Sequence, residues 1–106
     1  MPTFMRIFSY RIYFWSNENE PLEPVHVHIS EGNPSANATK YWINSDGSIE
    51  QENNNSLIPL KDLRKIEKTL QEYSNDIIDA WTKYFNETPT FHDEAQLNKL
   101  SNNKGL

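Results

Sequence analysis

Cysteine is absent from this sequence of 106 residues. Its absence excludes a disulfide framework, thiolate chemistry and zinc sites of the cysteine type. It also removes the cross-links with which small secreted domains compensate for a thin core. One core without cross-links is still feasible, because a chain of about one domain's length buries roughly two-thirds of its unfolded surface.

Long apolar runs are also missing. The most apolar stretch, residues 1–15, contains Arg6 and Arg11 and has no small-residue cleavage site. It therefore fits neither a signal peptide nor a membrane span. We expect a cytoplasmic protein that does not enter the membrane.

Basic residues are outnumbered by acidic ones. Ten Lys and Arg against 15 Asp and Glu leave a formal net charge of −5. This charge weakens any function in which the whole surface attracts nucleic acid, because such binding neutralises phosphates with Lys and Arg. With only three glycines, the sequence also has no Gly-rich phosphate loop, and it has no serine nucleophile elbow.

The N-terminal half is rich in β-forming residues. Residues 4–16 predict two antiparallel strands with a tight turn near Ser9 and Tyr10. Rings on both faces of the second strand indicate a central position in the sheet. Further strands are predicted over 25–30 and 38–44, and a weak, polar edge strand over 48–52 follows the turn signal Asp46-Gly47.

The C-terminal half changes to a helical period. Apolar residues recur every three or four positions from Leu60 to Tyr84, which predicts an amphipathic helix over 59–85. Ser74-Asn75 could cap a second helix, so a kink or a split is expected there. The fold class is therefore α+β, a small antiparallel or mixed sheet of four to five strands packed on this long helix. We expect one domain over 1–86 and a C-terminal tail over 87–106, flexible or a short helix near 93–100.

The chemistry-bearing feature is a pair of histidines on the third predicted strand. Alternation points Val25, Val27 and Ile29 to one face. His26 and His28 point to the other face, where two imidazoles can act as acid and base, so both are our catalytic candidates. The alternative is an outward face of polar residues without a function.

A metal site is the other alternative for these histidines. Zinc takes three or four ligands, and no third ligand lies at a telling spacing. His92 is in the predicted tail, and the nearby acidic residues are Glu18, Glu20, Glu23 and Glu31. No metal ligand set and no cofactor is therefore predicted.

Lys40, Trp42 and Arg11 are the candidate ligand-binding residues. If the third and fourth strands pair, Lys40 and Trp42 share the histidine face. A cation and a ring beside two imidazoles suit a phosphate or a nucleotide base. Alternatively, Trp42 packs against Tyr13 or Trp15, because aromatic cross-strand pairs are ordinary sheet stabilisers.

Several short segments, taken in order, resemble the bacterial domain-of-unknown-function 4160 family. They are residues 1–3, 6–7, 10–14, 16–18, 23–29, 40–43 and 63–85. The segment 23–29 is similar to the family's Pro-x-His-x-His signature. The chain departs from the pattern by an extra Pro-Leu stretch before the histidines and by residues 33–39 in place of a Gly-rich turn.

The resemblance implies a small cytosolic bacterial protein without an assigned reaction. Such proteins are often encoded beside a small protein of another uncharacterised family, and the pair is regarded as a toxin–antitoxin module. The first hypothesis is thus a toxin component acting on RNA or a nucleotide, with Lys40 or Arg11 holding phosphate. The alternatives are a non-enzymatic module that binds a protein partner through the ring-rich sheet face or the edge strand, and a metal-binding domain.

Overall fold

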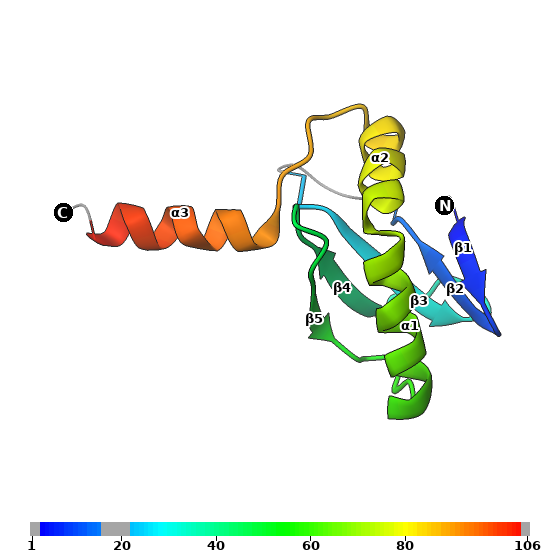
Figure 1. Cartoon of the computed structure of the whole chain (residues 1–106). Coiled ribbons are helices and arrows are strands. Elements are labelled where there is room, and N and C mark those ends of the chain that lie inside the picture. Colours follow the sequence, from blue (N-terminus) through cyan, green and yellow to red (C-terminus); the bar gives the residue numbers. More distant parts are fainter. Residues whose placement is uncertain (1–2, 16–21, 105–106) are drawn as a thin grey trace.

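A computed structural model describes residues 3–15 and 22–104 of the chain (Figure 1). Five strands are followed by three helices, so the α+β class with its N-terminal sheet is confirmed. The strands are β1 (Thr3–Ile7), β2 (Tyr10–Tyr13), β3 (His26–Glu31), β4 (Thr39–Ile43) and β5 (Ile49–Asn53). The helices are α1 (Leu60–Glu72), α2 (Ser74–Phe85) and α3 (His92–Lys104).

The strands form one antiparallel sheet in the order β1-β2-β3-β4-β5. β2 lies inside the sheet and β5 at an edge, as the sequence predicts. The first turn lies one residue earlier than expected, because Ile7 pairs with Tyr10 and leaves Phe8 and Ser9 as the turn. Phe8 has a positive φ of 54°, which two-residue hairpin turns require and which the sequence does not signal with Gly or Asn.

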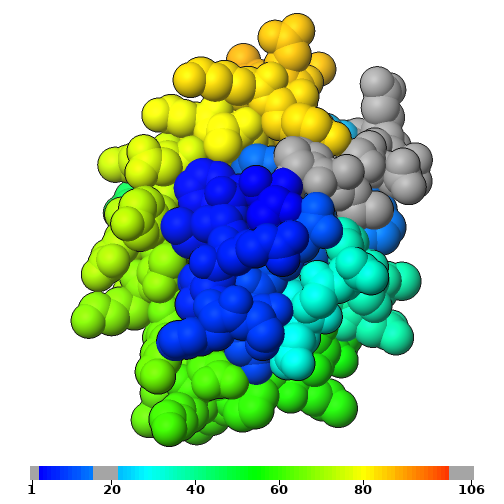
Figure 2. Space-filling view, turned by 90° about the vertical axis from the view of Figure 1, so that its right-hand side faces the viewer, coloured from blue at the N-terminus to red at the C-terminus, as the bar shows by residue number. Residues whose placement is uncertain are grey.

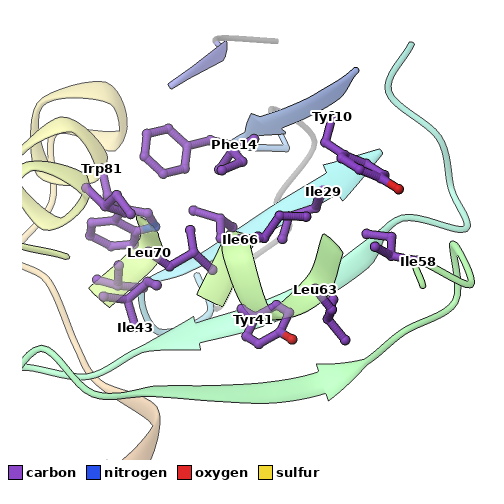
Figure 3. Packing of buried hydrophobic residues seen from close by; sticks show 14 residues of the cluster. Tyr10, Phe14, Ile29, Tyr41, Ile43, Ile58, Leu63, Ile66, Leu70 and Trp81 are labelled. Carbon is purple, nitrogen blue, oxygen red and sulfur yellow. The ribbon is translucent and has the colours of Figure 1, made fainter. Parts of the chain in front are cut away.

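Helices α1 and α2 cover one face of the sheet (Figure 1). Val25, Val27 and Ile29 lie on that face and are completely buried, as alternation predicts. Figure 3 shows Ile66 and Leu70 of α1 lying over the strands in the same core. Each such buried aliphatic side chain stabilises the fold by roughly 1.5–3 kcal/mol, so this face holds the sheet and helices together.

The helical segment 59–85 is two helices rather than one. They are separated at Tyr73, whose φ of −105° and ψ of 17° leave the helical range. Ser74 makes no side-chain capping bond at this point, so the capping role expected for Ser74-Asn75 is wrong. Ser74 is buried instead and faces the β4–β5 turn, where a Cβ on Gly47 would lie 3.0 Å from the Ser74 hydroxyl.

Residues 87–106 were expected to be flexible or a short helix, and the structure forms α3 over His92–Lys104. The chain just before α3 is held by the main body. The Val25 amide donates to the carbonyl of Thr90 at 2.9 Å, and Phe91 packs against the core. From there α3 extends away from the sheet (Figure 1). Within the described ranges, no helix has the length and apolar character needed to cross a membrane.

Two tyrosines tie α1 to the sheet. The Tyr10 hydroxyl donates to Asp62 at 2.8 Å, and the Tyr41 hydroxyl donates to Glu67 at 2.6 Å. The pKa of Tyr10 is raised to about 12. Burial is the largest cause, followed by the hydrogen bond to Asp62 and by the charges of Asp62 and Glu31. Burial and then Glu67 raise the pKa of Tyr41 above its ordinary value as well.

Stability is therefore expected to fall in strong alkali. The unfolded tyrosines ionise near pH 10, whereas the folded ones resist ionisation, so stability present below pH 10 is lost as the pH rises toward the folded pKa values. We expect the urea midpoint to drop between about pH 10 and 12 by this linkage. The urea midpoint of the double variant Tyr10→Phe/Tyr41→Phe should drop less over this range. The midpoint of Tyr84→Phe, a change at an exposed position, should fall as that of the wild type does. An unchanged pH profile of the double variant would contradict this account.

Candidate functional site

The sheet register brings the predicted site residues together on the face away from α1 and α2. One row across three strands is Tyr13, His28 and Lys40. The next row is His26, Trp42 and Glu50. The expectation that Lys40 and Trp42 share the histidine face is confirmed, because β3 and β4 are neighbours.

The aromatic side chains on this face form one connected group. The ring centroids of His26 and His28 are 5.0 Å apart, with the planes nearly perpendicular at 84°. His28 also stacks on Tyr13 at 5.8 Å and meets Trp15 edge-on at 6.1 Å, while His26 meets Trp42 at 5.4 Å. We call this group the ring cluster, and its members are Tyr13, Trp15, His26, His28, Trp42 and His92.

The two histidines differ in exposure. His26 is only 2% exposed, whereas His28 is partly exposed. The Nδ1 atom of His26 lies 2.8 Å from the carbonyl oxygen of Pro24. Since a carbonyl can only accept, Nδ1 donates, and this bond orients the ring. The side chain of His28 is therefore the more exposed of the two, although its Nε2 atom is buried, and His26 is held beside it.

Lys40 is positioned by a ring and a carboxylate. Its Nζ atom lies 4.3 Å from the centroid of the Trp42 ring and 2.9 Å from Glu23 Oε2. The side chain of Glu23 is 46% exposed. An ion pair with an exposed partner contributes only about 0–1 kcal/mol, so an incoming phosphate can compete with Glu23 for the ammonium group.

Trp42 is covered by a residue that sequence reasoning did not select. Its ring stacks on His92 at 4.3 Å with an interplanar angle of 2°, and its Nε1 donates to Glu52 at 2.9 Å. Tyr13 and Trp15 pack on each other at 6.3 Å and on His28. No local pattern marks His92, because only the folded chain brings it to Trp42.

Arg11 lies at the β1 side of the same face. Its Nε donates to the hydroxyl of Thr3, and its guanidinium carbon lies 5.9 Å from the centroid of the Tyr13 ring. In the register Arg11 is opposite Ser30, two positions along from the pair formed by Tyr13 and His28. It is therefore a neighbour of Tyr13, on the far side of the ring cluster from Trp42.

The described side chains contain no group of three or more His, Cys, Asp or Glu residues that could hold a metal ion. Glu18 and Glu20, two of the nearby acidic residues considered as ligands, lie outside the described residues.

A comparison with protein families matches residues 9–82 to the model of a domain of unknown function, DUF4160. The chain belongs to the DUF4160 family. The matched region contains both histidines of β3 together with Arg11, Lys40 and Trp42. His92 lies beyond it, so the ring that covers Trp42 comes from outside the DUF4160 region. Neither the curated proteins nor the solved structures that were compared give a match.

Proposed function

We propose that this DUF4160 protein acts on RNA or a nucleotide at the ring cluster, as the toxin component of a bacterial toxin–antitoxin module. The observation that supports the proposal is the adjacency of His26 and His28, 5.0 Å between centroids, with Lys40 opposite His28 on the next strand. Two adjacent imidazoles thus lie beside a cation of the kind that holds phosphate.

The ring cluster suits a base in single-stranded RNA. Stacking of a base on an aromatic side chain contributes about 1–3 kcal/mol and does not depend on the base's identity. Trp15, which follows β2, and His28, in β3, are two partly exposed rings of the cluster. Lys40 then takes the adjacent phosphate in exchange for Glu23. The net charge of −5 restricts such binding to this local surface.

The reaction that this arrangement supports is attack of an RNA 2′-hydroxyl on the adjacent phosphorus. The bond from phosphorus to the 2′ oxygen forms as the bond to the 5′ oxygen breaks. His28 accepts the 2′ proton, and the leaving 5′ oxygen takes a proton from water. His26 acts as a positioning residue, since it is buried and its Nδ1 is held by Pro24.

Induction of the chain in bacteria tests this proposal. We expect the wild type to arrest growth, whereas His28→Gln should grow as an uninduced culture does. The matched control is Lys83→Gln, an exposed change on α2 at the opposite face of the sheet, which should arrest growth like the wild type. With purified protein and a labelled RNA, His28→Gln should cleave at least about 100-fold more slowly than the wild type. A factor of about 100 is the low end of what loss of acid–base catalysis costs. Equal growth of wild type and His28→Gln would overturn the proposal.

A second candidate is a non-enzymatic module that binds a small protein encoded nearby. The edge strand β5 favours this second function. In the described sheet β5 pairs with β4 alone, and its residues 50–52 are exposed. Such an edge can accept an added strand from a partner. In that case co-purification with the neighbouring gene product should survive His28→Gln, and induction of the chain should leave growth unchanged.

A further inference from the structure

The outward side of α1 carries a concentration of positive charge that the proposed function does not use. Four of the chain's ten basic residues lie within eight positions, and all four are exposed. They are Lys61, Arg64, Lys65 and Lys68, and we call them the basic stripe. Spacings of three, four and seven place them along one side of the helix, while Leu63, Ile66 and Leu70 face the core.

Two of the acidic residues near the stripe are turned toward the sheet, whereas Glu72, four positions beyond Lys68, is exposed. Asp62 accepts the hydrogen bond from Tyr10, and Glu67 accepts that from Tyr41. Both carboxylates are therefore engaged at the flanks of α1. The outward side of the first two turns stays basic on a chain whose formal net charge is −5.

Three large apolar side chains stand exposed beside the stripe. Phe8 is 67% exposed, Leu57 83% and Leu60 62%, and we call them the apolar trio. Leu57 and Leu60 lie at the start of α1, and Lys65 Nζ lies 5.0 Å from the centroid of the Phe8 ring. Figure 2 shows the N-terminal hairpin in blue beside the green segment that leads into α1.

Two members of the trio hold a strained backbone. Phe8 has a φ of 54° and Leu57 a φ of 55°, a left-handed conformation that glycine or asparagine adopts more readily. Their side chains are mostly exposed, so their burial within this chain contributes little stabilisation to offset the backbone strain. Contact with a partner would bury both side chains.

We propose that the basic stripe and the apolar trio together bind an acidic amphipathic segment of another protein. Its carboxylates would face the stripe, and its apolar side chains would cover the trio. Charge complementarity favours this partner. Leu57 and Leu60 cannot stack on bases, which disfavours RNA. The surface lies across the sheet from the ring cluster, so the two proposals are independent.

The probe is a fluorescent helical peptide with glutamates on one face and leucines on the opposite face, titrated with the full chain. We expect binding that weakens as salt is added. Charge reversal of two residues of the stripe, Lys61→Glu/Lys65→Glu, should raise the Kd at least tenfold. The matched control, Lys83→Glu/Lys99→Glu, changes basic residues outside the stripe and should leave the Kd within twofold. No peptide binding, or equal loss in both variants, would overturn the proposal.

A second variant separates docking from folding. Leu57→Gly relieves a left-handed backbone and should leave the urea midpoint unchanged or higher, yet it should weaken peptide binding several-fold. A midpoint that falls together with the affinity would assign Leu57 a structural role and overturn its place in the surface. Stripe-dependent binding of a uridine oligonucleotide, or of vesicles containing anionic lipid, at an affinity above that of the peptide would likewise overturn the assignment to an acidic protein. None of these outcomes depends on growth arrest or on His28.

Discussion

Replacing Trp81 by alanine is expected to lower the free energy of unfolding by about 3–5 kcal/mol, the usual loss for a buried tryptophan. Trp81 is 1% exposed in the core between α2 and the sheet, and its ring lies 5.0 Å from that of Phe85. Truncation leaves a cavity that close-packed neighbours fill only in part. Such a loss is a large fraction of the roughly 5–15 kcal/mol that holds a domain folded.

Urea denaturation followed by circular dichroism measures the loss. Trp81→Phe should cost much less than Trp81→Ala, because phenylalanine keeps most of the ring and removes a buried polar atom. The Nε1 atom of Trp81 is buried without a hydrogen-bond partner among the described residues. Tyr84→Ala, on the same helix but 41% exposed, is the matched control and should cost under about 1 kcal/mol. A similar loss for Trp81→Ala and Tyr84→Ala would show that α2 is not packed as described.

His26→Ala is expected to destabilise the protein by about 2–3 kcal/mol, through lost ring packing and a lost buried hydrogen bond. Its ring packs edge-on against both His28 and Trp42, and its Nδ1 donates to Pro24. His28→Ala should cost less, about 1 kcal/mol, because that side chain is partly exposed. The same urea titration measures both variants.

His26→Phe separates packing from orientation at this position. It restores a ring of similar size without the bond to Pro24, so it should recover part of the stability lost in His26→Ala. If His26 positions His28 as proposed, His26→Phe should also keep part of the RNA cleavage that His28→Gln loses. Equal stability of His26→Ala and the wild type would contradict the buried placement of His26.

The two faces of the sheet differ in composition. The helix-covered face consists of apolar side chains whose burial holds the fold. The opposite face holds the ring cluster, in which polar rings are packed almost as tightly, with His26 and Trp42 buried. Such a face can stack a ligand on its exposed rings while the buried ones keep those rings in place.

The sequence by itself determined the elements and their faces. Alternation in residues 25–30 assigned Val27 to the core and His28 to the other side, because successive side chains in a strand point in opposite directions wherever the strand lies. The spacing from Leu63 to Trp81 likewise identified most of the helical face that the core uses, although Leu60 and Tyr73, on the same predicted face, are exposed. These are local properties of the backbone, so they can be predicted from neighbouring residues.

Only the tertiary structure decided how open the site is. Sequence reasoning placed His26 and His28 as equals, but the fold buries His26 and leaves the side chain of His28 partly exposed. It also brings His92 onto Trp42 and Glu23 onto Lys40, and it begins α2 without the side-chain cap expected at Ser74-Asn75. These features depend on contacts between segments far apart in the chain, and such contacts are settled by how the sheet, the helices and the connecting segments pack together.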